Sequence, residues 1–361
     1  MSNSIPIKNI YYFLAYVFSV LQTKTYEKLG REDFENSKEL LTEILLQSCT
    51  KLLKSGLNRG YINIEEKLSL IRGKINLSNT IRNLSNASNK IVCLHDEYTE
   101  DIYLNRLIKT TFLVLLKSDI SVARKKRIRA NLQFFKSVNT VDVLHCINSK
   151  YPLDRHTSSY RLIVFICSLI LNNYIQNKNA DGQKNKDFLD KKQLSYLYEK
   201  FILAYYTKHF PKLKPNASEI KWADLYSEDC SLLPRMRTDI TLTNEDNTKI
   251  LIIDAKFYND SLQKHHDKKS IISGHLYQIF AYVKNKSLLD KTKDVSGLLL
   301  YAKTEFDMQP KAKYSLSGNM ISVDNLDLSK DFYVICEQLN NIVYEWDNSL
   351  AKKSLEDLGI K

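Results

Sequence analysis

Apolar residues recur every three or four positions in several long segments of this chain. That spacing is typical of helices that bury one face. The first such segment is apolar around most of its circumference, so we expect it to be largely buried. The predicted helices span residues 9–22, 38–55, 100–117, 121–136, 158–175, 190–209, 270–285 and 332–346.

An alternation of period two, typical of strands, replaces the helical period in two parts of the chain. Residues 61–81 alternate in short runs with Gly73 at a bend, which predicts a small β-element between helices. Later in the chain, a helix, two strands, a second helix and a further strand follow one another. This order predicts an α/β fold with a mixed central sheet. The later strands are predicted near 219–223, 236–243, 249–256 and 295–301.

A chain of 361 residues is long for a single core, so we expect two domains. The polar, proline-containing segment 148–160 is the candidate boundary. Residues 1–150 would then form a mostly helical N-terminal domain that carries the β-element. Residues 151–361 would form the α/β domain.

The composition indicates an intracellular protein with a polyanionic partner. The net charge of +12 favours nucleic acid. The six cysteines are scattered without C-x-x-C spacing, as in a reduced cytoplasmic protein. No apolar run has the length of a membrane span, and the N-terminus lacks the pattern of a signal peptide. The basic run 124–129 is either a solvated helix face or a contact for DNA or an acidic partner.

The candidate chemistry lies in two adjacent predicted strands. Asp239 is in the first of them, and the second ends in Asp254-Ala255-Lys256 after four aliphatic residues. Alternation places Asp254 and Lys256 on one face. Two carboxylates suit Mg²⁺, which prefers oxygen ligands, and a neighbouring lysine can orient or deprotonate the attacking water. These residues predict a metal-dependent phosphodiesterase.

The register of the hairpin decides whether the two carboxylates meet. A turn centred on Asp246 sets Asp239 opposite Ile253, and the carboxylates then lie on opposite faces. A shift by one residue sets Asp239 opposite Asp254 on a shared face. The sequence does not choose between these registers, and the nuclease hypothesis requires the second or a bulge of the same effect.

Gln278 and Tyr282 follow at helical spacing, on one face of the predicted helix. The acid, the Asp-x-Lys and the later Gln-x-x-x-Tyr together resemble the PD-(D/E)XK nuclease superfamily, although Thr238 stands where the superfamily often has proline. The resemblance implies Mg²⁺ as cofactor and Asp239, Asp254, Lys256 and Gln278 as catalytic residues. It also makes Glu199 the candidate for a further metal-binding acid beside Asp239 and Asp254.

A closer resemblance rests on short motifs kept in order from residue 5 to about residue 300. The opening Ile5-Pro6-Ile7-Lys8-Asn9-Ile10-Tyr11-Tyr12 and the later Leu232-Leu233-Pro234-Arg235-Met236 are the more specific ones; Gly73-Lys74-Ile75 and Asn105-Arg106-Leu107-Ile108-Lys109 add to them. They are similar to the McrC family, the nuclease subunits of McrBC modified-cytosine restriction systems.

That resemblance implies a division of labour. The N-terminal half would dock into the ring of a McrB-like AAA+ GTPase hexamer and stimulate GTP hydrolysis, and the C-terminal half would cut double-stranded DNA. The chain has no G-x-x-x-x-G-K-[ST] motif, so GTP would be bound by the partner. Arg72, Lys74 and Arg82 in the β-element are the candidate docking residues. A stand-alone nuclease and a non-catalytic activator are the alternatives.

Overall fold

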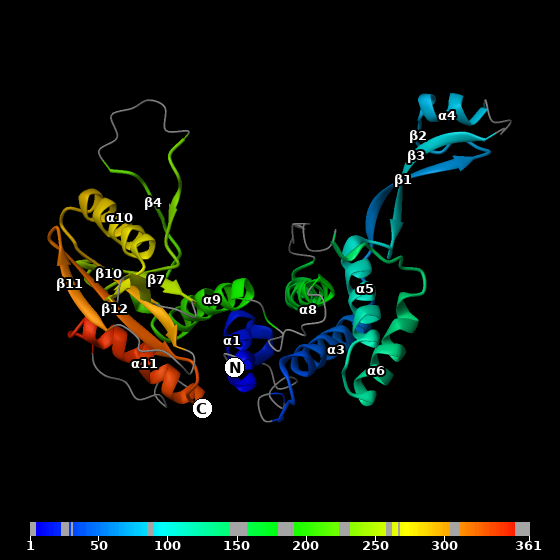
Figure 1. The fold of residues 1–361 in the computed structure, drawn as a ribbon. Coiled ribbons are helices and arrows are strands. Elements are labelled where there is room, and N and C mark those ends of the chain that lie inside the picture. The colour runs from blue at the N-terminus through cyan, green and yellow to red at the C-terminus, as the bar shows by residue number, and fades with distance from the viewer. Residues whose placement is uncertain are drawn as a thin grey trace. The chain divides into compact units, whose positions relative to one another are not determined.

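The computed structural model describes residues 5–22, 29, 32–84, 90–144, 157–179, 189, 191–223, 232–257, 262–265, 268–303 and 311–350. The chain divides into two compact units (Figure 1). Residues Lys38–Phe188 form one, called here the inserted unit. Residues Met1–Ser37 and Leu189–Lys361 form the other, called the sheet unit.

A five-stranded mixed sheet is the centre of the sheet unit, as the sequence predicts. Its order is β11-β12-β10-β7-β6, and β7, β10 and β12 run parallel while the two outer strands are antiparallel to their neighbours. Strand β7 has the predicted limits. The strands are β6 (Ile240–Thr243), β7 (Lys249–Lys256), β10 (Asp294–Lys303), β11 (Ala312–Leu316) and β12 (Asn319–Asp327).

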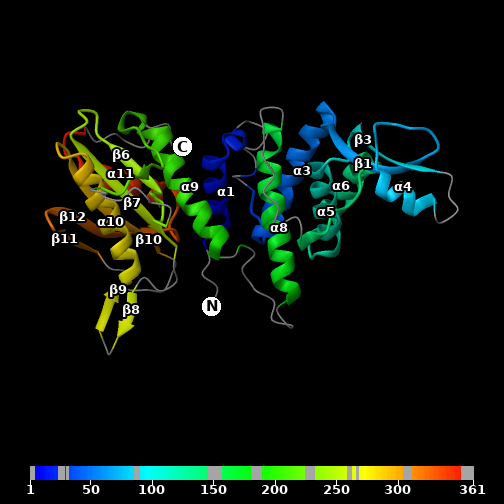
Figure 2. The same cartoon turned by 90° about the horizontal axis from the view of Figure 1, so that it is seen from above.

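Helices cover both faces of this sheet. Helix α10 (Ser273–Leu289) lies on one face and α11 (Phe332–Trp346) on the other (Figures 1 and 2). Gly297 in β10 lets α10 approach closely, because a Cβ atom there would lie 2.7 Å from Val283 Cγ2 and 2.9 Å from Ile279 Cγ1. The core between α10 and the sheet is aliphatic, with Ile250 and Ile252 of β7 nearly or fully buried in it.

The N-terminal helix α1 (Ile7–Val17) belongs to the sheet unit. Phe13 stacks on Phe201 of α9 (Lys191–His209) with 4.3 Å between ring centroids, and Tyr12 stacks on Phe332 at the same distance. The buried Asn9 amide donates hydrogen bonds to the carbonyl oxygens of residues 328 and 330. The observed units therefore differ from a division at residue 150, because this apolar helix buries its surface against helices from the C-terminal half.

Residues 151–188 also fall on the other side of the predicted boundary. Helix α8 (Arg161–Asn179) packs in the inserted unit, where the Tyr160 hydroxyl donates a 2.8 Å hydrogen bond to Asn105 Oδ1. This unit also contains α3 (Ser37–Ser55), α5 (Tyr103–Lys117) and α6 (Val122–Leu132). No helix in the described part of the chain is long and apolar enough to cross a membrane.

The predicted β-element is an antiparallel sheet in the order β1-β3-β2 with one helix, α4. The strand expected to continue to Leu77 ends after Ile75. The Asn76 side chain accepts a hydrogen bond from the Asn79 N–H at 3.2 Å, as a helix-capping residue does, so a helix begins there. The elements are β1 (Gly60–Leu68), β2 (Lys74–Ile75), α4 (Leu77–Leu84) and β3 (Ile91–Thr99).

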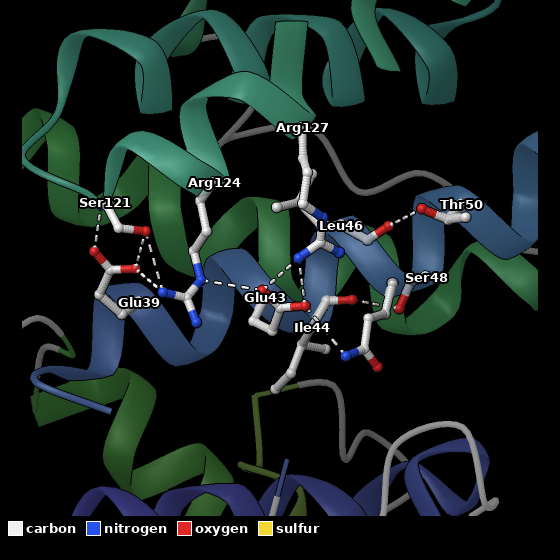
Figure 3. A network of polar contacts seen from close by, with 10 residues as sticks. Glu39, Glu43, Ile44, Leu46, Ser48, Thr50, Ser121, Arg124 and Arg127 are labelled. Atoms are coloured by element: carbon white, nitrogen blue, oxygen red, sulfur yellow. Dashed lines mark hydrogen bonds and ion pairs between the residues drawn. The ribbon is translucent and has the colours of Figure 1, made fainter. Parts of the chain in front are cut away.

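Part of the basic run on α6 is internal. Arg124 lies 2.5 Å from Glu39 and 3.1 Å from Glu43 of α3, and Arg127 lies 2.8 Å from Glu43 (Figure 3). Both glutamates are buried, so these ion pairs join α3 to α6. These two arginines are thus partly taken up by the fold and do not belong to a fully solvated helix face.

Candidate active site

The β6–β7 hairpin has the register in which the two candidate carboxylates meet. Ile240 pairs with Ile253, and continuing the ladder by one residue sets Asp239 opposite Asp254. Asp239 itself lies at the bend between β5 (Met236–Arg237) and β6, where the sequence predicted an uninterrupted strand.

The turn explains this register. The N–H of Asn244 bonds to the carbonyl oxygen of Lys249 at 3.1 Å, which leaves a loop of the four residues 245–248. The Asn244 side chain accepts hydrogen bonds from the N–H groups of Thr248 and Lys249, each at 2.9 Å. Asn247 takes the left-handed conformation with φ of 58°, which asparagine tolerates better than most residues. An even-numbered loop brings Asp239 and Asp254 to one face.

Asp254, Asp239 and Lys256 form the centre of the site. Asp254 is 1% exposed. The Asp239 Oδ2 atom accepts a 2.9 Å hydrogen bond from the Ala255 N–H, which fixes its carboxylate beside the end of β7. The Lys256 ammonium lies 2.7 Å from Asp254 Oδ2. That oxygen is buried without a hydrogen bond of good geometry, so the ion pair is close but poorly directed.

A relay of side chains from α10 holds the other side of Lys256. Its ammonium donates to Gln278 Oε1 at 2.9 Å, and Gln278 Nε2 donates to the Tyr282 hydroxyl at 2.9 Å. The sequence predicted Gln278 and Tyr282 on one helix face, and the structure places both toward the Asp254–Lys256 pair. Lys256 thus lies between a carboxylate and an amide oxygen with its side chain only 13% exposed.

Burial raises the pKa of both carboxylates, and at Asp239 like charge adds to the effect of burial. Burial is the larger cause for Asp239 and, together with the charges of Asp254 and Glu199, raises its pKa to about 7 against the opposing effects of the Ala255 N–H and Lys256. Burial also raises the pKa of Asp254, although Lys256 opposes it. The site disfavours the charged form of both carboxylates, so a bound cation would stabilise them.

Glu199 on α9 lies near this centre but does not complete a ligand set with it. Burial raises its pKa, and the charges of Lys256 and Asp254 act on it, while Ser195 donates a 3.2 Å hydrogen bond to its Oε1. Among the described residues, no three His, Cys, Asp or Glu side chains converge closely enough to hold one metal ion. A metal-binding role for Glu199 therefore stays a prediction.

The two aspartates by themselves fit a magnesium ion. Asp254 lies in β7 and Asp239 at the bend that precedes the neighbouring β6. Asp254 has a buried oxygen without a well-formed hydrogen bond, and burial disfavours both charges. Mg²⁺ is commonly held by one or two carboxylates and completes its shell with water and substrate oxygens. The donor set is thus chemically suited to this ion.

His275 is a neighbour that the sequence analysis missed. It lies on the first turn of α10, is buried, and its Nδ1 is 2.9 Å from the hydroxyl of Tyr301, the residue paired with Lys256 across β10 and β7. Burial and, secondarily, the charge of Lys256 lower its pKa to about 4. The imidazole is therefore neutral near pH 7. Its position three residues before Gln278 was the available signal.

The candidate docking residues belong to the inserted unit, whereas the candidate active site belongs to the sheet unit. Arg72, Lys74 and Arg82 are exposed on the β-element. Large apolar side chains are exposed around them, which the sequence analysis did not single out: Tyr61, Leu70, Ile71, Leu77, Ile81 and Tyr98. An apolar surface with basic residues is typical of a protein-binding surface.

Comparisons with known proteins identify the family of this chain. The family model described as "McrBC 5-methylcytosine restriction system component" matches residues 7–302. The chain belongs to this family. It is 28% identical over 346 residues to the type IV methyl-directed restriction enzyme EcoKMcrBC of Escherichia coli K12, covering 95% of this chain and 98% of that protein. The McrBC match includes every residue of the candidate site.

Two solved structures of McrBC assemblies also match. One is a half-complex of Thermococcus gammatolerans McrB AAA+ hexamers with bound McrC, at 15% identity and a TM-score of 0.49, covering 94% of this chain and 76% of that one. The other is the McrBC complex of the same organism, at 17% identity and a TM-score of 0.38, covering 56% and 58%.

Proposed function

We propose that this chain is the endonuclease subunit of a McrBC-like restriction system and hydrolyses phosphodiester bonds of methylated double-stranded DNA with Mg²⁺. The observation that carries the proposal is the convergence of Asp239, Asp254 and Lys256 at the open end of a buried strand pair. It occurs within a chain of the McrBC family. A nuclease core of the PD-(D/E)XK type would account for both.

Each residue has a distinct role in this chemistry. A bound Mg²⁺ would supply Lewis-acid activation and offset charge on the phosphate. Asp239 and Asp254 would hold this ion through carboxylate oxygens. Lys256 orients the attacking water and stabilises the negative charge that develops on the phosphoryl oxygens. Gln278, braced by Tyr282, keeps the lysine ammonium directed at the reacting group.

The partner we propose is a McrB-like AAA+ GTPase hexamer that binds the GTP. One of the similar structures contains McrB AAA+ hexamers with bound McrC, and this sequence has no G-x-x-x-x-G-K-[ST] motif. The exposed apolar and basic surface of the β-element supports docking through the inserted unit. Arg72, Lys74 and Arg82 are the residues proposed to contact the ring.

The test mixes the full chain with a McrB-like AAA+ GTPase, GTP and Mg²⁺, and compares methylated with unmethylated plasmid. Lys256→Ala should abolish cleavage and leave GTPase stimulation intact. Lys249→Ala is the matched control, since Lys249 begins the same strand and pairs with Asp347 at 3.3 Å, away from the carboxylates.

Each outcome separates the alternatives. Cleavage of methylated plasmid that is lost only in Lys256→Ala supports the proposal. Equal cutting by that variant and the parent refutes the site. Stimulated GTP hydrolysis without cleavage indicates an activator, and cleavage without the partner indicates a stand-alone nuclease.

A further inference from the structure

A two-stranded ribbon, β8 (Leu262–His265) and β9 (Lys268–Ile271), connects the two elements that carry the candidate active site. It follows β7, which ends at Lys256, and precedes α10, which carries Gln278. The ribbon is a separate sheet and extends away from the central sheet (Figure 2). Its position along the chain therefore ties it to the site on both sides.

The base of the ribbon is anchored on both sides. Phe257, directly after β7, is buried and packs edge-to-face against Tyr198 with 6.1 Å between ring centroids. Ile271, the last residue of β9, packs against the core under α10. The rest of the ribbon belongs to no strand ladder but its own. Isolated two-stranded ribbons are marginally stable in water.

The charges on the ribbon make its stability lower still. Residues 262–271 contain three lysines and two histidines against one aspartate. In the register, Lys264 is opposite Lys269 and His265 is opposite Lys268. Like charges at directly opposite positions destabilise an antiparallel pair. A weak ribbon that sets Lys264 opposite Lys269 is unfavourable to the free protein, and a polyanion bound along the ribbon would offset this repulsion.

We propose that the ribbon strands 262–265 and 268–271 bind the phosphate backbone of the DNA duplex beside the bond to be cut and hold the duplex at the site. This inference rests on the proposed nuclease function and identifies the surface that binds the substrate. Each strand of four residues is about 13 Å long, at roughly 3.3 Å per residue. The DNA major groove is about 12 Å wide and admits a two-stranded ribbon. DNA is the partner that combines this shape with this charge.

The experiment measures the salt dependence of DNA binding. The full chain carrying Asp254→Asn, which should not cleave, is titrated against a labelled duplex of about 30 base pairs by fluorescence anisotropy at several salt concentrations. Lys264→Gln, Lys268→Gln and Lys269→Gln are then combined in that background. If all three lysines contact phosphates, the slope of log K against log salt should fall by about 2.7, at about 0.9 per contact.

The control removes the same charge elsewhere in the sheet unit. The control variant combines Lys311→Gln, Lys313→Gln and Lys330→Gln, which replace lysines on or beside β11 and β12, at the opposite end of the sheet from β6. Its slope should stay within about 0.5 of the parent's slope. In the cleavage-competent protein, the ribbon substitutions should raise the KM for DNA several-fold and change kcat by less than twofold. Tryptophan fluorescence should show an unfolding midpoint no lower than the parent's.

An unchanged slope in the ribbon variant, or an equal change in the control, overturns the inference. Loss of GTPase stimulation with an unchanged slope also overturns it and assigns the ribbon to the protein partner. A reduced slope in a chain whose parent form never cleaves would refute the nuclease proposal and retain the ribbon as a DNA-binding element.

Discussion

Asp239→Asn should stabilise the metal-free protein at alkaline pH while it removes nuclease activity. The asparagine is nearly isosteric, and its Oδ1 can still accept the hydrogen bond that Asp239 takes from the Ala255 N–H. What the substitution removes is a carboxylate that burial and the neighbouring Asp254 and Glu199 disfavour in its charged form.

The magnitude follows from the pKa of Asp239. It rises from 3.8 to about 7 on folding, and each pKa unit corresponds to about 1.4 kcal/mol, so ionised Asp239 costs up to about 4 kcal/mol. Between these two values the folded state binds more protons than the unfolded state. The contribution to stability is therefore fully present below pH 3.8, falls as pH rises toward 7, and is lost above it.

The assay is urea unfolding in EDTA at pH 5.5 and pH 8.5, followed by tryptophan fluorescence. The chain has two tryptophans, Trp222 and Trp346, and both are in the sheet unit, so the signal reports the unit that carries the site. The parent should lose about 2 kcal/mol more than Asp239→Asn between the two pH values. Mg²⁺ should stabilise the parent at pH 8.5 and have a much smaller effect on the variant.

The reasoning fails if parent and variant lose equal stability between pH 5.5 and 8.5. It also fails if Asp239→Asn is less stable than the parent at pH 8.5 in EDTA, because the carboxylate would then be a favourable part of the fold. Asp246→Asn in the exposed β6–β7 turn is the control and should leave the pH dependence unchanged.

Three further predictions concern single side chains. Gly297→Val should destabilise the sheet unit by about 1–3 kcal/mol because its side chain overlaps that of Ile279, and an unchanged urea midpoint in tryptophan fluorescence would contradict this. Arg124→Ala should destabilise the inserted unit by about 3 kcal/mol because it removes the ion pairs of Arg124 with the buried Glu39 and Glu43. Thermal unfolding followed by circular dichroism should show a smaller loss for the more exposed Arg127→Ala, and equal losses would argue against that account. Tyr282→Phe removes the acceptor for the Gln278 amide and should lower kcat about tenfold with little change in KM, so a change confined to KM in steady-state cleavage would contradict the relay.

The sequence predicted those parts of the fold in which local pattern and burial agree. β7 and α11 have the predicted limits because β7 is a continuous aliphatic run and α11 is periodic, and each ends where the chain becomes polar. Tertiary contacts decided the rest. α1 was predicted as a buried helix, but nothing in its own residues shows that Phe13 packs on Phe201, nearly two hundred positions away.

The candidate site was predictable to the same extent. Residue type and spacing picked out Asp239, Asp254, Lys256 and Gln278, and the structure brings them together. The register between Asp239 and Asp254 was not predictable, because it depends on the hydrogen bonds that the Asn244 side chain makes within the turn. His275 was not found because only the three-dimensional pairing of β7 with β10 brings Tyr301 beside Lys256.

The packing of α1 on the C-terminal helices determines which fragments of this protein can fold separately. A C-terminal fragment that begins after residue 150 would lack α1 and leave Phe201 and Phe332 uncovered, so this fragment should aggregate. Excising residues 38–188 and joining the ends with a flexible linker keeps α1 in place. The inserted unit thus interrupts the sequence of the sheet unit after the first helix of the sheet unit. Recombination at residues 38 and 188 would exchange the inserted unit and leave the core of the sheet unit intact.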